Sequence, residues 1–399
     1  MRMLHTSDWH LGRSFGPASL AADQQAFVDW LVGQVGEQRI DLVVIAGDIY
    51  DRAIAPTEAV VMFREALHRL LATGAKVVVI TGNHDGADRV AAYDDLLDLS
   101  GLYLRGGYSR IGEVVTVAMA DGPLDLVLLP FLDPQAAPDS LADDALAGDG
   151  SAGDASTGDA DAVARLARRT HQSVLEAAIA AATPNLRSPR SLAVSHAFVA
   201  GGAITDSERP LTVGGTGTVD AALFAPFSYT ALGHLHRPQA VAGHPTVVYS
   251  GTPLAYSFSE DHAKSVCVVD MAPDGTCSID TVHVPVGRGV VTVTGTIDQL
   301  LSATPTAATL TSFVRAIVTD AGAVLDAKQR LTAVYPHVVE IVLAPPVRDG
   351  EAAAAIDRRT MSAAEAADAF WLASVGSPPT DPQQHLLHTA LAEAEGKVA

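Results

Sequence analysis

The chain has 399 residues, 48% of them hydrophobic and 18% charged, which is typical of a globular protein of two or three domains. Its formal net charge of −20 argues against nucleic-acid binding driven by overall charge. No apolar run reaches the roughly 18 residues of a membrane-spanning helix. A cleaved signal peptide would remove the polar motif at 8–10. We therefore expect a cytoplasmic protein without a membrane segment.

The first 130 residues alternate between strand-like and helix-like segments. Apolar runs predict strands at 3–6, 42–46, 77–80 and 124–129. Amphipathic spacing predicts helices at 23–39 and 56–72, and in the second helix the apolar face is Val60, Phe63, Leu67 and Leu70. Such alternation predicts an α/β fold with a largely parallel, buried sheet. Ligands of such sheets bind at loops beyond the carboxyl ends of the strands.

An acidic insert follows at about 133–190. It contains eight Asp and no Lys or Arg between Asp133 and Asp161, and its low complexity predicts a loop to about 158. A helix is expected at 160–182. Further strands are expected at 191–195, 229–232 and 247–249, with a hairpin at 265–284. Cys267 and Cys277 flank the turn of that hairpin, where they either face each other or remain two inert thiols.

The pattern changes after residue 287, which ends the predicted first domain, 1–287. Residues 288–346 predict a small α+β domain, with strands at 290–296, 314–319 and 338–342 and helices at 297–301 and 325–334. Residues 347–399 predict a helical tail, with helices at 362–373 and 382–396.

Five short segments at strand ends carry the chemistry. They lie at 8–10, 47–51, 82–85, 195–198 and 233–236. Their side chains offer carboxylate and amide oxygens and imidazole nitrogens, and the proposed ligands are Asp8, His10, Asp48, Asn83, His196, His234 and His236. A set of O and N donors without thiolate favours Mn²⁺, Fe²⁺ or Zn²⁺. Two such ions, bridged by Asp48, can polarise a phosphate ester for hydrolysis.

His84 is expected to act differently from the ligands. It lies between Asn83 and Asp85 and need not touch an ion, so it can protonate a leaving oxygen or stabilise the transition state. Asp51 or Asp85 could orient its imidazole, and Asp51 is the preferred candidate. The catalytic pair predicted from the sequence is therefore His84 and Asp51.

With these segments in view, the chain resembles the calcineurin-type metallophosphoesterases, whose core is a β-sandwich flanked by helices. More closely, it resembles the SbcD family of nuclease subunits from bacterial SbcCD DNA-repair complexes. The resemblance rests on the runs at 5–13, 207–215, 231–239 and 249–260, on Phe370-Trp371 and on the end of the tail. It runs from residue 1 to about 395, apart from the insert.

The resemblance implies the same seven ligands, with Mn²⁺ as the expected metal, and a phosphate-side role for His84. It implies ATP-dependent exonuclease action on duplex ends and endonuclease action on single strands or hairpins. Residues 288–346 are then a capping domain over DNA, and the tail docks on the ATPase subunit SbcC. A homodimer is implied, with helices near 56–72 and 88–99 as candidate interfaces. Candidate DNA contacts are Arg13, Arg52, Arg89 and Arg237.

Two other classes of function share this site. A small-molecule or cyclic-nucleotide phosphodiesterase would keep every ligand without needing the additional domain or the tail. A protein phosphatase or a non-catalytic scaffold is the third possibility, although a scaffold would be expected to lose ligands or His84. The partner ATPase of a nuclease could supply phosphate-binding surface, which reconciles a charge of −20 with DNA.

Overall fold

The structure is a computed structural model that describes residues 1–138, 169–208, 217–322, 324–344 and 362–394. The loop predicted at 133–158 and the start of the helix predicted at 160–182 lie largely outside these residues. The chain forms two compact units, Met1–Ala344 and Pro345–Ala399. Among the described helices, none combines the length and apolar character needed to span a bilayer.

The first of two large sheets carries the N-terminal strands. Its order is β16 (Cys277–His283), β15 (Ser265–Met271), β1 (Arg2–Thr6), β4 (Leu42–Ala46), β5 (Lys76–Ile80) and β6 (Leu102–Arg105). Strands β1, β4, β5 and β6 run parallel, whereas β15 pairs antiparallel with β1 and β16 pairs antiparallel with β15. The parallel strands therefore end at one edge, where the loops after β1, β4 and β5 meet.

The second sheet is built mostly from the middle of the chain. Its order is β13 (Gln239–Val241), β14 (His244–Tyr249), β12 (Tyr229–Gly233), β9 (Ser191–His196), β8 (Gly122–Leu129) and β7 (Val114–Met119). Strands β8, β9, β12 and β14 are parallel. The ends of β9 and β12 carry the two remaining motifs, so all five motifs follow parallel strands.

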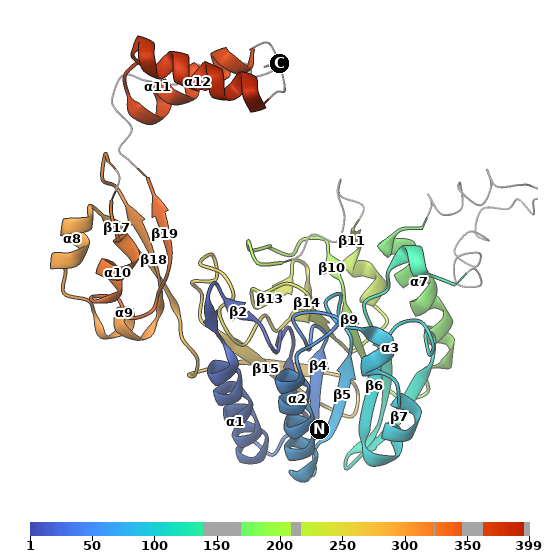
Figure 1. Ribbon diagram of the computed structural model, residues 1–399. Helices are drawn as coiled ribbons and strands as arrows, with labels where there is room; N and C mark the ends of the chain where they lie inside the picture. The colour runs from blue at the N-terminus through green and yellow to red at the C-terminus, as the bar shows by residue number, and fades with distance from the viewer. Residues whose placement is uncertain (139–168, 209–216, 323, 345–361, 395–399) are drawn as a thin grey trace, which may run out of the picture. The chain divides into compact units, whose positions relative to one another are not determined.

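The two sheets pack face to face, with helices on their outer faces (Figure 1). Val44 and Ile80 of the first sheet and Leu126 and Val194 of the second belong to the core between them. Helices α1 (Ala21–Glu37) and α2 (Thr57–Ala72) cover the first sheet, and α7 (His171–Ala182) covers the second. The predicted α/β fold, a β-sandwich flanked by helices, is confirmed.

Several local predictions are wrong. In α2 the buried face includes Ala59 and Ala66, whereas Val60 is 45% exposed. Residues 88–99 form no continuous helix but three short pieces, α3 (Ala87–Val90), α4 (Asp94–Leu97) and η1 (Asp98–Ser100). For the hairpin cysteines, the alternative in which they face each other is wrong, because the register pairs Cys267 with Thr281. The other expectation, two free thiols, agrees with the structure.

Part of the predicted insert belongs to the hydrophobic core. Helix α7 carries Val174 and Ile179 into the core of the second sheet, and its N-cap Thr170 forms a capping box with Ser173. The short helix η3 (Thr183–Asn185) then leads into β9. Residues 169–190 therefore belong to the sandwich.

A small third sheet follows within the first unit. It is parallel throughout, in the order β17 (Val290–Gly295), β18 (Phe313–Val318) and β19 (Val338–Leu343). Three helices accompany it, α8 (Ile297–Ser302), α9 (Ala307–Thr311), which the sequence analysis did not predict, and α10 (Ala327–Thr332). Phe313 stacks on Phe15, with ring centroids 4.6 Å apart, and Arg288 lies over the Phe313 ring and pairs with Asp23.

The second unit contains two helices, α11 (Ala363–Val375) and α12 (Asp381–Ala394). Ser362 caps α11 in a capping box with Glu365, and Gly376 ends it in the left-handed conformation. The helices contact each other through Asp368, which accepts hydrogen bonds from Gln384 at 2.7 Å and His388 at 3.0 Å.

Candidate metal centre

The loops after β1 and β4 are joined by backbone hydrogen bonds. Asp8 N donates to Gly47 O and His10 N donates to Asp48 O, each at 3.0 Å. Among the described residues, six non-glycine residues have positive φ, and four of them are predicted ligands (Asp8, His10, Asp48 and His234). Such backbone costs about 1 to 3 kcal/mol per residue and clusters at functional sites. The strain here coincides with the predicted ligands.

Asp48 lies at the centre of the predicted ligands. Its Oδ2 is 3.7 Å from His10 Nε2 and 3.5 Å from His196 Nε2. Its other oxygen, Oδ1, accepts a hydrogen bond from the main-chain N of His84 at 2.9 Å, which fixes the carboxylate. One Asp48 oxygen is therefore close to imidazoles from both sides of the site.

The other ligand atoms converge on either side of Asp48. Asn83 Oδ1 lies 3.0 Å from His196 Nε2 and 3.2 Å from His234 Nδ1. On the opposite side, the Nε2 atoms of His10 and His236 are 3.4 Å apart. All seven predicted ligands are thus brought together.

This donor set fits divalent metal ions. Three groups have ligand atoms within 4.8 Å of one another: Asp8 with His10 and His236, Asp8 with Asp48 and His196, and His10 with Asp48 and His84. The facing Nε2 atoms of His10 and His236 can share one hydrogen bond or, when both carry lone pairs, both bind a cation. Carboxylate, amide and imidazole donors without thiolate suit Mn²⁺, Fe²⁺ or Zn²⁺.

Burial sets the protonation of the site without metal. It lowers the pKa of His10 well below its ordinary value and that of His234 to about 3, and it raises the pKa of Asp8 to about 6. Burial alone would also lower the pKa of His196, but the carboxylates of Asp48 and Asp8 and the carbonyl of Ala46 together outweigh it and raise that pKa to about 9. The neutral imidazoles of His10 and His234 are in the form that binds metal.

Two glycines allow this close approach of the loops. A Cβ on Gly82 would lie 2.1 Å from Asp48 Oδ1, and a Cβ on Gly233 would lie 1.9 Å from Ala46 O. No side chain can occupy either position without moving backbone or a ligand. The glycines of these motifs are therefore part of the site geometry.

His84 borders the cluster but is oriented otherwise than predicted. Its Nδ1 donates to the main-chain O of Asp51 at 2.8 Å, so the carboxylate of Asp51 does not hold it. That carboxylate instead pairs with Arg13 at 3.3 Å and lies 4.0 Å from His10 Nδ1. Asp85 does not touch the ring either, because its carboxylate accepts three main-chain N–H bonds, from Ile49, Tyr50 and Gly82.

The four candidate DNA-contacting arginines differ in setting. Arg13 is half-buried, with its guanidinium 4.9 Å from the ring centroid of Tyr256 as well as paired with Asp51. Arg52 and Arg89 are exposed, and Arg237 is half-buried beside His236. Arg13 therefore has a packing role independent of any ligand.

A group of residues behind His236 was not predicted from the sequence. The main-chain N of His236 donates to Glu208 at 2.8 Å, and its Nδ1 lies 2.6 Å from Ser207 Oγ and 3.1 Å from Glu260 Oε1. Ser207 and Glu260 both belong to runs that carried the family resemblance. No spacing rule links residues 53 positions apart, so only the fold reveals their meeting.

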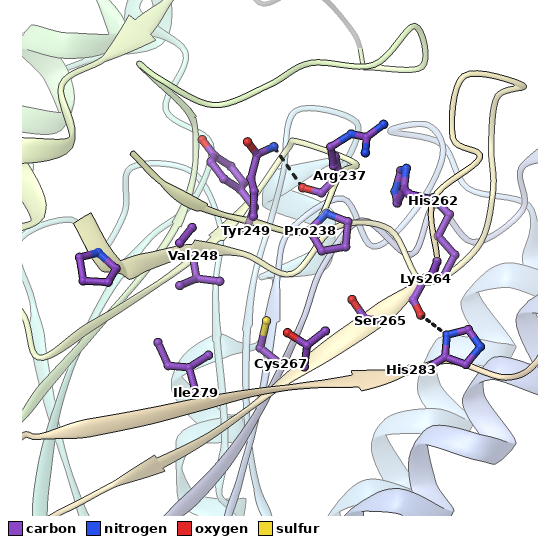
Figure 2. Close-up of a pocket in the computed structure, with 15 residues that line it drawn as sticks. Arg237, Pro238, Val248, Tyr249, His262, Lys264, Ser265, Cys267, Ile279 and His283 are labelled. Carbon is purple, nitrogen blue, oxygen red and sulfur yellow. Dashed lines mark hydrogen bonds between the residues drawn. The ribbon is translucent and has the colours of Figure 1, made fainter. Parts of the chain in front are cut away.

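A cavity of about 510 Å³ adjoins this group (Figure 2). Its lining includes Arg237, His262 and Lys264 on one side and Val248 and Ile279 on another. None of the predicted metal ligands lines it, so it is separate from the metal centre. Lys264 connects the two, because its Nζ donates to Glu260.

Comparison with known proteins agrees with this geometry. Residues 1–140 match the calcineurin-like phosphoesterase family, and residues 286–373 match the family described as the type 5 capsule protein repressor C-terminal domain (SbcD_C). The chain is 37% identical over 296 residues to the SbcD subunit of the nuclease SbcCD from Bacillus subtilis (strain 168), covering 73% of this chain and 71% of that protein.

Two solved structures also resemble the chain. One is TT1561 of Thermus thermophilus, with a TM-score of 0.37 and 13% identity over 71% of this chain and 98% of that one. The other is GAP50, the anchor in the inner membrane complex of Plasmodium, with a TM-score of 0.35 and 9% identity over 87% of this chain and 99% of that one. At these scores neither resemblance bears on function.

Proposed function

We propose, from the premise that the chain belongs to the SbcD family of calcineurin-like phosphoesterases, that it is the Mn²⁺-dependent DNA nuclease subunit of an SbcCD-type complex. Its class of activity, metal-dependent phosphodiester hydrolysis, follows from the family. The proposal adds the metal, the partner and the reactions, which are ATP-dependent exonuclease action on duplex ends and endonuclease action on single strands and hairpins. The observation that carries it is Asp48 Oδ2, which lies between His10 and His196.

Two ions would be held on either side of Asp48. Asp8, His10 and His236 would hold the first, and Asn83, His196 and His234 the second, with Asp48 shared. When bound, the ions supply Lewis-acid activation of the phosphate ester and of its nucleophile. The chain's own contribution is a largely buried donor set whose loops are joined by backbone hydrogen bonds.

His84 would act on the substrate side. Because the Asp51 carbonyl only accepts, the ring carries a proton on Nδ1, and Nε2 is directed elsewhere. In the doubly protonated ring, Nε2–H donates a proton to the leaving oxygen or a hydrogen bond to the phosphoryl group. Asp51 supports this role through its main chain, and its carboxylate positions Arg13.

DNA contacts would come partly from this chain and partly from its partner. Arg52, Arg89 and Arg237 lie beside the motifs and can pair with phosphates flanking the scissile bond. With a net charge of −20, this chain gains little from general electrostatic attraction to DNA. An ATPase partner with a basic surface would supply the rest, and the third sheet, β17 to β19, would cap the DNA.

The tail is the proposed docking segment for that ATPase. Phe370 is 74% exposed in α11, and Leu386 is 71% exposed in α12. Large exposed apolar side chains on two helices that already contact each other are typical of a surface for a partner helix. A coiled coil of the partner fits this description.

Exposed apolar side chains support the proposed homodimer. They are Ile54, Val60, Tyr93, Leu96 and Leu99. Apart from Ile54, which precedes α2, these residues lie on α2 and in the segment 88–99, the two stretches predicted as candidate interfaces. Burying about 800 Å² per subunit is the usual size of a stable interface.

A nuclease assay tests the proposal. The purified chain is incubated with Mn²⁺ and linear duplex or hairpin DNA, with and without the SbcC-type ATPase and ATP. We expect hairpin cleavage, and duplex degradation that requires the ATPase and ATP. The control substrates are bis(p-nitrophenyl) phosphate and cyclic nucleotides. Efficient cyclic-nucleotide hydrolysis, with no DNA cleavage even in the presence of the ATPase, would overturn the proposal.

A further inference from the structure

A buried carboxylate lies directly behind His236, outside the set of metal ligands. Glu260 is only 1% exposed. Its Oε1 faces His236 Nδ1 at 3.1 Å and accepts a hydrogen bond from Ser207 Oγ. Its Oε2 accepts from Thr252 Oγ1 at 2.9 Å and from Lys264 Nζ. Both carboxylate oxygens therefore have donors, and this carboxylate is an ordered part of the interior.

The arrangement determines which nitrogen of His236 carries the proton. A carboxylate only accepts, so the hydrogen of the neutral ring is placed on Nδ1, shared between Glu260 and Ser207 Oγ at 2.6 Å. The lone pair then remains on Nε2, which faces His10 Nε2 at 3.4 Å inside the cluster. This is the tautomer and the orientation that an ion at this position requires.

The main chain of His236 is held as firmly as its ring. Its N donates to Glu208 at 2.8 Å, and its O accepts from the main-chain N of Thr252 at 3.1 Å. Lys264, on the wall of the cavity in Figure 2, supplies the counter-ion for Glu260. Without that cation, a buried carboxylate would be costly to keep charged.

The two halves of the metal centre differ in this respect. His196, on the other side of Asp48, donates its Nδ1–H to a main-chain carbonyl, Ala46 O, at 2.9 Å. A carboxylate partner makes an imidazole a stronger ligand than a neutral carbonyl does. The side of the centre that contains His236 is thus supported by charge, and the side that contains His196 by backbone.

We propose that Glu260 is a positioning residue for the ion held by Asp8, His10 and His236, with Lys264 as its counter-ion. This inference rests on the two-ion site of the proposed function and adds that its two ions depend on different supports. Loss of Glu260 weakens one ion selectively. It also leaves the donors of the other ion, Asn83, His196 and His234, in place.

The test measures metal binding in the purified full-length chain. Glu260→Gln keeps the size of the side chain but removes its charge. We expect isothermal titration calorimetry to show two Mn²⁺ sites in the wild type, one of which weakens by about 10- to 100-fold in the variant. Electron paramagnetic resonance at two equivalents of Mn²⁺ should change from a spin-coupled pair toward isolated ions.

Two further variants separate positioning from folding. Glu260→Gln combined with Lys264→Met removes both charges and leaves no unpaired cation, and it should show the same selective weakening with metal-free thermal unfolding near that of the wild type. Asp261→Asn, at an exposed neighbour, should bind both ions normally. Unchanged affinities in both Glu260 variants, or equal weakening of both ions, would overturn the role of Glu260. A wild-type chain that binds no Mn²⁺ would overturn the proposed function itself.

Discussion

The metal centre and the helical tail depart in opposite ways from the usual distribution of polar and apolar side chains between surface and interior. In the centre, polar side chains are buried, with Asp8 and His10 both 0% exposed, whereas in the tail Phe370 and Leu386 lie mostly in solvent. A buried polar group and an exposed apolar group are each more informative than the usual arrangement. The buried polar groups of the centre indicate a bound cation. The exposed apolar groups of the tail indicate a partner with an apolar surface.

The two regions also differ in how they are held. The predicted ligands lie at the ends of parallel strands that form a continuous core, and backbone bonds such as Asp8 N to Gly47 O join their loops. In the tail, two helices contact each other through Asp368 and otherwise expose large apolar side chains. Chemistry and partner binding should therefore be separable by mutation, which the first two experiments below test. Two more ask what buried and exposed polar groups contribute outside the metal centre.

The largest effect is expected from His84→Ala. The ring lies beside the ligand cluster but is anchored to the Asp51 carbonyl, so its loss should leave both ions in place. Cleavage of DNA should fall by about 10² to 10⁴-fold, the usual contribution of a positioned acid. Nuclease rates and metal content by mass spectrometry measure the two properties. Asp48→Asn is the matched control, and it should lose metal as well as activity. Loss of metal in His84→Ala would make His84 a ligand.

The second experiment removes part of the tail. Deleting residues 378–399 removes α12 and should weaken binding of the SbcC-type ATPase by at least about 30-fold, the loss of one interface hot spot. Hydrolysis of bis(p-nitrophenyl) phosphate should stay unchanged, because the metal centre lies in the other unit. Surface plasmon resonance gives the affinity. Wild-type affinity in the truncated chain would exclude α12 from the interface.

These contrasts also explain what the sequence could predict. Strand β4 was predicted to the residue, because a run of five buried apolar residues followed by Gly47 has few other interpretations. The seven predicted ligands could be grouped as a set, because each lies at or just after the end of a strand and each residue type can bind metal. Periodicity and side-chain chemistry carry this information locally.

What could not be predicted depends on contacts between distant segments. Ala59 rather than Val60 faces the core, because the direction of the α2 face is set by the sheet beneath it. His84 is held by the main-chain carbonyl of Asp51. Every residue has such a carbonyl, so the residue types do not show which one a side chain will bind. Glu260 meets Ser207 only through the fold. The short pieces at 87–100 likewise interrupt what looked like one helix.

The third experiment asks whether buried polarity always marks a ligand site. His5 is fully buried but lies outside the cluster, between Tyr229 Oη at 3.1 Å and Leu232 O at 3.2 Å. Burial lowers its pKa to about 3. The unfolded chain, with an ordinary histidine pKa of about 6.5, therefore binds the proton more readily below that pH. Stability from His5 is complete above about pH 6.5 and is lost as the pH falls toward about 3.

Between about pH 7 and pH 5 the contribution of His5 to the free energy of unfolding should fall by about 2 kcal/mol. The glutamine of His5→Gln does not titrate in this range. The drop in the free energy of unfolding from about pH 7 to about pH 5 should therefore be smaller in the variant than in the wild type by that amount. Urea denaturation in EDTA at both pH values measures the difference. His68→Gln, at an exposed histidine, is the control for the substitution itself. Equal pH dependence in His5→Gln and the wild type would mean that His5 does not titrate as a buried neutral group.

The smallest effect is expected where polar groups lie in their ordinary place, on the surface. Arg69 of α2 pairs with Asp29 of α1 at 2.6 Å, with side chains 39% and 55% exposed. The guanidinium lowers the pKa of Asp29, yet water and salt screen such a pair. Asp29→Asn should change the free energy of unfolding by less than about 1 kcal/mol, and less still in about 1 M NaCl. A larger, salt-independent loss in urea denaturation would show that exposed polarity also carries structural weight here, and would weaken the contrast between buried and exposed groups.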